Sequence, residues 1–135
     1  HEYRFLSNFW PAGVQLQGLW FPTVEHAYQA AKTLDIRERE AISLLFTPGE
    51  AKRAGRYLLI RPDWETVKLS IMENLVRQKF QSPNLRKKLL ETKDAKLEEG
   101  NRWKDRFWGV YNGQGENHLG KILMKIRDEI KKEQT

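Results

Sequence analysis

The sequence predicts an α+β fold: a compact, mostly helical single domain spanning residues 1–135, with a few short strands. Three observations favour it. A chain of 135 residues is long enough for one hydrophobic core but not for two independent ones. Apolar residues recur at helical spacing over most of the chain, and alternation at the period of a strand is confined to a short stretch near Val14. We find no internal repeat and no linker.

Residues 3–24 predict one or two short strands joined by turns, because Val14 to Gln17 alternates apolar and polar residues among several Pro and Gly. A helix then begins near Thr23, a residue that can cap it, and continues to Lys32. The spacing buries the face formed by Val24, Ala27, Tyr28 and Ala31.

The spacing of apolar residues, together with the Pro, Gly and capping residues between them, predicts five more helices. We expect them at 35–46, 48–55, 63–80, 82–90 and 119–130. Gly55 is the expected C-cap of the second of these. Residues 92–101 read as a loop with one more strand, and 112–115 as a turn. The residues expected to point inward from 35–46 are Ile36, Ala41, Ile42, Leu45 and Phe46, those from 63–80 are Val67, Ile71, Leu75 and Val76, and those from 119–130 are Ile122, Leu123, Ile126 and Ile130.

Composition excludes several classes of site. The chain has no Cys, so disulfide scaffolds, zinc–thiolate sites, iron–sulfur clusters and thiol nucleophiles are excluded. His26 and His118 have no carboxylate or second His at ligand spacing, so we expect structural histidines, no metal and no cofactor. No apolar stretch approaches the ~20 residues that span a bilayer, and the sequence contains no signal-peptide pattern. We therefore expect a cytoplasmic protein with no membrane partner and a monomer by default. Because the chain begins at His1 rather than Met, we also expect residues upstream.

The formal charge of +6 indicates an anionic partner, such as nucleic acid, a nucleotide or a sugar phosphate. The basic residues Lys52, Arg53, Arg56 and Arg61 are either a solvated face or the phosphate-binding edge of a nucleotide pocket.

Two residues of the first predicted helix could carry chemistry. Glu25 either complements the helix dipole or, beside Trp20 and Phe21 in a partly apolar pocket, acts as a general acid or base. Lys32 is either an exposed lysine late in a helix, an ammonium that binds an anion, or an amine that forms a Schiff base with a sugar aldehyde.

A second carboxylate lies in an aromatic segment near the C-terminus. Asp105 either forms an ion pair with Arg102 or Arg106 or serves as the partner of Glu25, since glycoside cleavage commonly uses two carboxylates. The five Trp are core residues by default. Trp64 opens a helix and Trp108 precedes a Gly, so either ring could stack on a base.

Taken together, these segments resemble the NADAR family, also called YbiA-like, from about residue 5 to residue 127. The matching segments are Phe5-Leu6-Ser7-Asn8-Phe9, Phe21 to Lys32, Ala51-Lys52 with Gly55-Arg56, Arg61-Pro62-Asp63-Trp64 with Lys68 and Met72, Lys79-Phe80, Asn101 to Gly109, and Gly115 to Met124 with Ile126-Arg127. The sequence does not depart from the family pattern at a chemical position, although the region before Phe5, which often supplies a first strand, is nearly absent.

The resemblance implies an N-glycosidase that cleaves the bond between a ribose C1 and an amine nitrogen. One branch of the family acts on ribosylamino-pyrimidine phosphates of riboflavin biosynthesis. Another removes ADP-ribose from guanine in nucleic acid, and some of its members are antitoxins to a DarT-type toxin, a functional rather than a physical partner. The short chain, the lack of a fused riboflavin-pathway domain in it and its basic charge favour ADP-ribosylated guanine, in DNA for example, over a free ribose-phosphate substrate.

In the implied mechanism Glu25, Lys32 and Asp105 are catalytic. Glu25 handles protons, Asp105 is its partner, and Lys32 either forms an iminium with the sugar or aids direct hydrolysis electrostatically. The expected substrate contacts are Ser7, Asn8, Phe9, Trp20, Tyr28, Lys52, Arg56, Trp64, Trp103, Trp108, Gly109 and Asn117. Two other classes stay open: a non-catalytic ADP-ribose-binding module, which would not need all three catalytic residues, and a plain nucleic-acid-binding protein, which only the charge favours.

Overall fold

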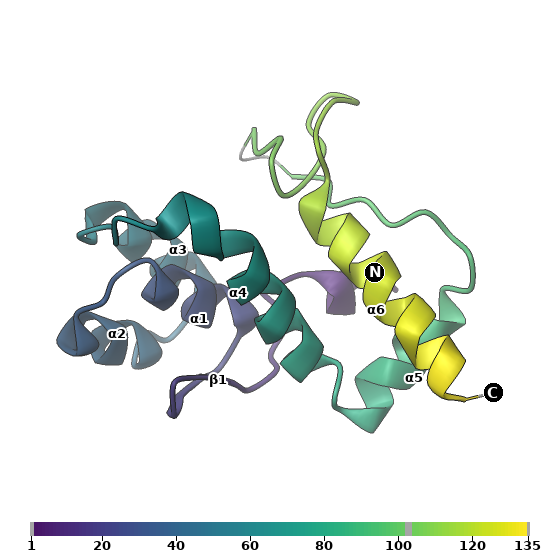
Figure 1. Ribbon diagram of the computed structural model, residues 1–135, viewed down its shortest axis with the longest axis horizontal. Coiled ribbons are helices and arrows are strands. Elements are labelled where there is room, and N and C mark those ends of the chain that lie inside the picture. The colour runs from purple at the N-terminus through teal and green to yellow at the C-terminus, as the bar shows by residue number, and fades with distance from the viewer. Residues whose placement is uncertain (1, 102–103, 135) are drawn as a thin grey trace. The chain divides into compact units, whose positions relative to one another are not determined.

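The computed structural model describes residues 2–101 and 104–134. Its elements, drawn in Figure 1, confirm an α+β fold dominated by helices. In chain order they are η1 (Arg4–Leu6), β1 (Val14–Leu16), β2 (Leu19–Phe21), α1 (Val24–Ala31), α2 (Ile36–Ser43), α3 (Pro48–Ala54), η2 (Gly55–Tyr57), α4 (Trp64–Lys79), α5 (Pro83–Glu91) and α6 (His118–Glu133).

The chain folds into two compact units, one ending at Lys79 and the other beginning at Phe80. Each unit is described by itself below. The expectation of one domain over residues 1–135 stays a prediction.

In the first unit, the strands expected near Val14 are β1 and β2, and the structure pairs them as a hairpin. The strands are antiparallel, with Val14 opposite Phe21 and Leu16 opposite Leu19. Gln17 and Gly18 both adopt positive φ, 49° and 84°, as the two central residues of a type I′ turn require. Val14 and Phe21 are fully buried, so one face of this small sheet contributes to the core.

Helix α1 is the centre of the first unit, and Figure 1 shows α2, α3 and α4 gathered about it. Thr23 caps the helix as predicted, because its hydroxyl accepts from the His26 amide at 3.1 Å. All eight residues of α1 are buried, including Glu25 and Gln29. A helix buried all round is normally apolar, so each polar side chain here needs a reason and a partner.

His26 illustrates the structural solution. Its Nδ1 lies 2.7 Å from the Thr23 hydroxyl and its Nε2 lies 3.0 Å from the Leu45 carbonyl oxygen. The carbonyl can only accept, so Nε2 carries the proton and Nδ1 accepts. Burial lowers the pKa of His26 from its ordinary value. His26 is therefore a hydrogen-bonded structural histidine, as the sequence predicts.

The inward face predicted for residues 35–46 is wrong, except at Ile42. The helix ends at Ser43, so Phe46 lies in the connection to α3, where it is 93% exposed, and Ile36, at the first helical position, is also exposed. Ala41 is exposed as well, and Leu45 is half-buried beside a hollow of about 220 Å³ that Ile42, Tyr57 and Leu58 also line.

The side chains that α2 does bury are Ile42 and Arg39. Arg39 donates to the Thr33 carbonyl oxygen at 2.8 Å and to Gln17 Oε1 at 2.7 Å, which ties α2 to the hairpin turn.

Helix α4 closes the first unit. It buries Leu75 and Val76 as predicted, leaves Val67 and Ile71 half-buried, and buries Met72 and Lys79 in addition.

The second unit contains α5, the segment 92–117 and α6. The further strand expected in 92–101 is wrong within the described residues: the segment contributes only an isolated bridge, between Gly100 and Val110. The predicted turn at 112–115 is confirmed by a bridge between Tyr111 and Gln114.

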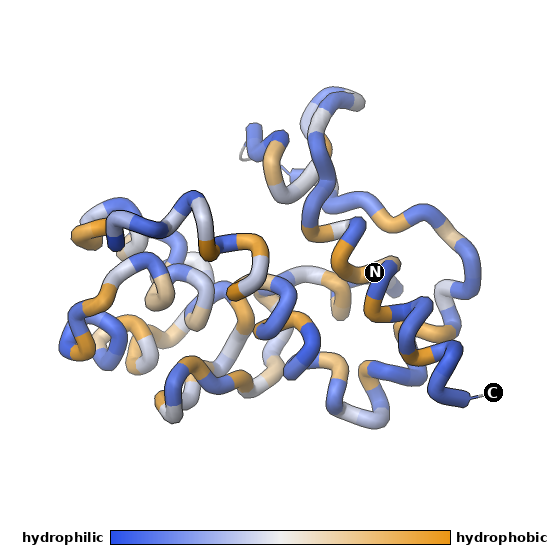
Figure 2. Tube along the Cα trace, viewed as in Figure 1, coloured by the Kyte–Doolittle hydropathy of each residue, from blue (hydrophilic) through white to orange (hydrophobic). Residues whose placement is uncertain are grey.

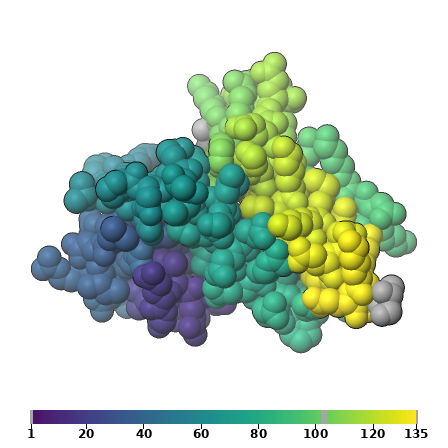
Figure 3. All heavy atoms as spheres, viewed as in Figure 1, coloured from purple at the N-terminus to yellow at the C-terminus, as the bar shows by residue number. Residues whose placement is uncertain are grey.

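Helix α6 has one apolar and one polar face. The four residues expected to point inward are all buried, and Figure 2 shows orange and blue alternating along this helix. Lys121, Lys125 and Asp128 are exposed, and the yellow-green atoms of α6 are open to the viewer in Figure 3. Within the residues described, no helix is long and apolar enough to cross a membrane.

Candidate functional site

Glu25 lies in the first turn of α1 with only 7% of its surface exposed. Its amide donates to the Asn8 carbonyl oxygen at 3.1 Å, which joins the Ser7–Phe9 segment to this turn. Its Oε2 accepts a hydrogen bond of 2.7 Å from Gln29 Nε2, one helical turn later. A buried carboxylate that accepts a hydrogen bond from Gln29 is more than a surface charge that complements a helix dipole.

Gln29 is a residue that the sequence prediction missed as part of the site. Its Nε2 must face the carboxylate, because the other orientation would place two oxygens together. Its Oε1 consequently faces Gly55, and this oxygen has no hydrogen-bond partner in the described part of the chain. The i, i+4 spacing of Glu25 and Gln29 was the only signal in the sequence.

Lys32, Tyr28 and Trp64 are three predicted site residues that the structure brings together. Lys32 is the C-cap of α1, and its Nζ lies 5.5 Å from the centroid of the Tyr28 ring, within the range of a cation–π contact. The Tyr28 and Trp64 rings pack at 5.2 Å between centroids and 54° between planes. Both aromatic residues are buried.

The Ser7–Phe9 segment is anchored from α4. Lys79 Nζ donates to the Ser7 carbonyl oxygen at 2.8 Å, and the Ser7 hydroxyl accepts from the Phe9 amide at 3.0 Å. Asn8 is buried, and its Nδ2 lies 3.5 Å from Met72 Sδ, whereas its Oδ1 has no partner within the described residues. Sequence reasoning missed the role of Lys79. Burial lowers its pKa from 10.5 to about 7.

The other predicted residues of the first unit are more exposed. Trp20 is 56% exposed on β2, and its indole lies against Gly13, where a Cβ would be 2.4 Å from Nε1. Lys52 is half-buried on α3, and Arg56 is exposed on η2.

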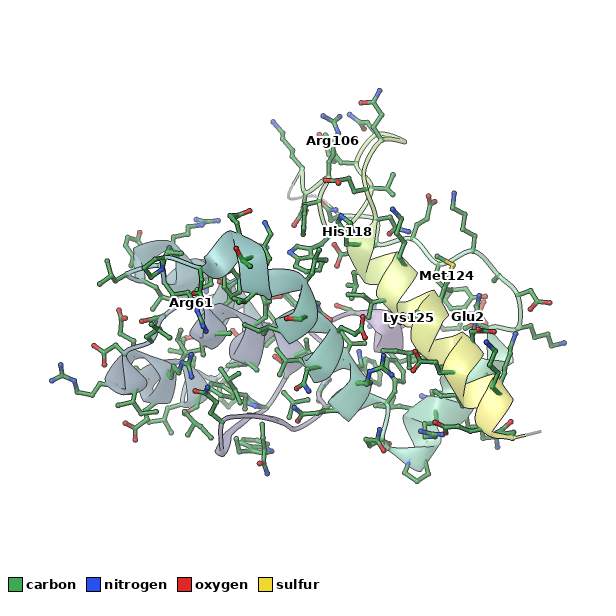
Figure 4. All side chains as sticks on the ribbon, viewed as in Figure 1. Glu2, Arg61, Arg106, His118, Met124 and Lys125 are labelled. Carbon is green, nitrogen blue, oxygen red and sulfur yellow. The ribbon has the colours of Figure 1, made fainter. Side chains whose placement is uncertain are left out.

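Arg61, labelled in Figure 4, is not a free cation of the basic run. It forms a bidentate pair with Asp63, at 2.6 and 3.1 Å. The hydrogen bonds raise the pKa of Arg61 and lower the pKa of Asp63. This pair sits directly before Trp64, and the Arg61 amide donates to the Lys32 carbonyl oxygen at 2.7 Å. The pair therefore orders the approach to α4 beside the end of α1.

In the second unit, Asp105 organises a tight turn. Its Oδ1 accepts from the amides of Phe107 and Trp108, at 3.0 and 2.9 Å. Its own amide donates to Asn101 Oδ1 at 2.9 Å, and Asn101 Nδ2 donates back to its carbonyl oxygen at 3.0 Å. The carboxylate thus fixes the backbone that carries Trp108.

Trp108 is buried and meets Phe107 edge-on at 4.9 Å. The next residue, Gly109, has no room for a side chain, since a Cβ would be 2.2 Å from the Glu99 carbonyl oxygen. His118, at the start of α6 in Figure 4, packs on Phe107 at 4.5 Å between ring centroids.

The Asn117 side chain holds the backbone of the segment before Gly100. Its Oδ1 accepts from the Glu99 amide at 3.0 Å and its Nδ2 donates to the Leu97 carbonyl oxygen at 2.8 Å. It also adopts a positive φ of 55° just before α6. Its contact with a substrate stays a prediction. Trp103 lies outside the described residues.

Glu25 and Lys32 belong to the first unit and Asp105 to the second, so the pairing of Glu25 with Asp105 stays a prediction. Throughout the described ranges, no group of three or more His, Asp or Glu is placed to hold a metal ion. The chemistry assembled in the first unit is that of a buried carboxylate and a lysine on one helix, with aromatic rings beside the lysine.

Known proteins are similar to this chain over nearly its whole length. A family model described as the NADAR domain matches residues 1–131. The N-glycosidase Npun_R5314 of Nostoc punctiforme is 42% identical over 136 residues, covering 96% of this chain and 86% of that protein. The riboflavin biosynthesis protein VVA0006 of Vibrio vulnificus is 38% identical over 133 residues. The match covers 96% of this chain but only 36% of that longer protein.

A solved structure shares the fold. The NMR structure of the Escherichia coli protein YbiA matches with a TM-score of 0.87 and 38% identity, covering 99% of this chain and 82% of that one. The named relatives support an N-glycosidase role, that of a hydrolase of N-glycosyl compounds. The chain belongs to the NADAR family.

Proposed function

We propose that this chain hydrolyses the bond between a ribose C1 and an amine nitrogen, and that its substrate is guanine in nucleic acid that carries ADP-ribose. The observation that carries the proposal is the buried Glu25 carboxylate, held by Gln29 on the helix that ends at Lys32. Removal of ADP-ribose would suit an antitoxin that reverses the action of a DarT-type toxin.

Glu25 is the proton donor in this proposal. The C1–N bond breaks with its electron pair staying on the base nitrogen, which takes a proton from the Glu25 carboxyl group. General acid catalysis of this kind contributes typically about 10²–10⁴-fold to a rate.

Lys32 offers two routes. In the first, its neutral amine bonds to the sugar C1 as the base leaves, the ring-opened sugar is held as an iminium, and water then adds to C1 and releases the sugar and the amine. In the second, water attacks C1 directly and the Lys32 ammonium acts only as a nearby charge. Trp64, which packs on Tyr28 beside Lys32, would wall the ribose or base in both routes.

The segment around Asp105 would supply the rest of the site. Asp105 would act as the partner of Glu25, and its two bonds to backbone amides would hold Trp108 ready to stack on a base.

Charge favours a substrate with several phosphates. The chain carries +6 overall, and Lys52 and Arg56 flank Gly55 in sequence, the residue that lies against the amide of Gln29. Because Gly55 lies against Gln29, the partner of Glu25, the neighbouring cations Lys52 and Arg56 suit the binding of a pyrophosphate near Glu25.

A second substrate has a specific observation in its favour. Two relatives are named riboflavin biosynthesis proteins, VVA0006 and the maize protein PYRR, and each is 38% identical to this chain. A ribosylamino-pyrimidine phosphate contains the same linkage between ribose C1 and an amine.

One experiment separates the substrates. The protein is incubated with DNA that carries ADP-ribose on guanine and, in parallel, with the ribosylamino-pyrimidine phosphate, and sugar release is followed for each. The proposal predicts faster release from the DNA. Faster release from the pyrimidine phosphate would assign the second substrate, and binding of ADP-ribose without release from either would indicate a binding module.

Borohydride separates the two routes through Lys32. Added during turnover, it should reduce an iminium to a stable adduct on Lys32, visible by mass spectrometry, and Lys32→Arg should abolish the adduct. Turnover without an adduct would rule out the iminium route and assign direct hydrolysis.

A further inference from the structure

We propose that Gln29 is a positioning residue for Glu25 and that Gly55 is a glycine because this arrangement needs the space. This inference rests on the proposed function, since it assigns a task to the partner of the proposed proton donor. Neither residue touches the substrate in this scheme.

The first support is the geometry on α1. Gln29 Nε2 lies 2.7 Å from Glu25 Oε2, a short bond to a charged group from the same face of the helix. The carboxyl group can rotate about its last bond only by breaking this contact. An acid that delivers a proton to one nitrogen gains from a fixed orientation, because misplacement by about 1 Å can cost 10²-fold in rate.

The second support is the backbone at Gly55. It adopts φ −57° and ψ −23°, an ordinary right-handed conformation that any residue can take. Gly55 is the C-cap of α3, as the sequence predicts, but a left-handed conformation is not what requires a glycine there. Space gives the reason instead: a Cβ on Gly55 would be 1.9 Å from Gln29 Oε1 and 2.8 Å from its Cδ.

The third support is the cost of this arrangement to the fold. Gln29 is only 3% exposed, and its Oε1 has no hydrogen-bond partner within the described residues. A buried acceptor left unsatisfied is unfavourable for folding, and an apolar side chain would fill the space without that penalty. A structural role alone does not explain a half-satisfied amide here, whereas an amide that orients Glu25 does.

Two single variants test the proposal on whichever of the two substrates wild type turns over. Gln29→Met keeps the size of the side chain and removes its N–H, and Gly55→Ala leaves Gln29 in place but displaces its amide. Both should lower kcat by about 10–100-fold, the range expected for losing a hydrogen bond to a charged group, with KM nearly unchanged. Gly49→Ala on α3 is the matched control, because the nearest atom to its Cβ would be 3.8 Å away, and it should keep wild-type kcat.

A double-variant cycle separates positioning from simple destabilisation. With Gln29→Ala there is no amide to displace, so adding Gly55→Ala should lower kcat no further. An equal loss from Gly55→Ala in both backgrounds would overturn the link between Gly55 and Gln29.

Gln29→Glu adds a readout that a purely structural role would not move. It places a second carboxyl group against Glu25, and two such neighbours resist ionising together. The alkaline limb of the pH–rate profile, on which the rate falls as the proton donor ionises, should therefore move to higher pH, with unchanged circular dichroism. A wild-type profile would contradict the proposal.

The variant Glu25→Gln distinguishes failure of the proposed proton donor from failure of the inference about Gln29 and Gly55. If it retains activity, the proposed role of Glu25 fails. If it loses activity while both Gln29→Met and Gly55→Ala match wild type, the role of Glu25 stands and only the inference about Gln29 and Gly55 is refuted.

Discussion

Lys79 should make the stability of the protein depend on pH in a predictable direction. The side chain is 2% exposed, its Nζ donates to the Ser7 carbonyl oxygen, and burial lowers its pKa from 10.5 to about 7. Below pH 7 the amine is protonated in both the folded and the unfolded chain, so the penalty of burying a charge is fully present. Between about pH 7 and 10.5 the unfolded chain keeps a proton that the folded chain releases, so stability rises with pH.

The magnitude follows from the width of this window. Each pH unit is worth about 1.4 kcal/mol, so Lys79 alone contributes of the order of 5 kcal/mol between pH 7 and 10.5. The neutral amine can still donate to the Ser7 carbonyl oxygen, so this rise does not require the loss of that contact.

Urea unfolding of wild type and Lys79→Met at several pH values from 6.5 to 10 measures the effect. Other groups contribute equally to both proteins, so the difference in unfolding free energy isolates Lys79. Wild type should gain several kcal/mol relative to Lys79→Met as the pH rises. Parallel pH curves for the two proteins would refute the reasoning.

Two further predictions concern the second unit. Gly109→Ala should destabilise the protein by roughly 1–3 kcal/mol, because its Cβ would meet the Glu99 carbonyl oxygen at 2.2 Å, whereas Gly100→Ala, with no atom within 4 Å, should change thermal unfolding little. Equal effects of the two would contradict the close packing. Asn117→Ala should cost about 2–4 kcal/mol, since it loses two buried hydrogen bonds and strains a positive φ, and Asn117→Gly should recover only the backbone part of that loss. A full recovery in urea unfolding would show that the side-chain bonds contribute nothing.

The sequence predicted the elements whose signals are local. Thr23 caps α1, and the apolar spacing of α6 places its buried face correctly, because capping and periodicity depend on neighbours within a few residues. The prediction for residues 35–46 is wrong because apolar residues at helical spacing continue past Ser43, where the helix ends. Phe46 therefore lies outside the helix and is exposed rather than on a buried helix face.

The parts of the site that sequence reasoning missed depend on contacts between distant residues. Gly55 lies against Gln29 across 26 positions, and Lys79 reaches Ser7 across 72. A Gly after a helix is typical of a C-cap, which Gly55 is, and a Lys in a last turn is typical of solvent exposure, so the local pattern indicates neither the contact with Gln29 nor the burial of Lys79. Glu25, Tyr28, Lys32 and Trp64 could be proposed because they belong to one helix and one motif that follows it.

The most direct test of the account is a single-turnover assay of sugar release with two matched variants. Glu25→Gln and Glu65→Gln each neutralise a glutamate in the first turn of a helix, but Glu25 is buried against Gln29 whereas the Glu65 side chain is 81% exposed. On DNA that carries ADP-ribose on guanine, Glu25→Gln should lose about 10²–10⁴-fold in rate while remaining folded, and Glu65→Gln should match wild type. A Glu25→Gln protein that releases ADP-ribose at the wild-type rate would contradict the account.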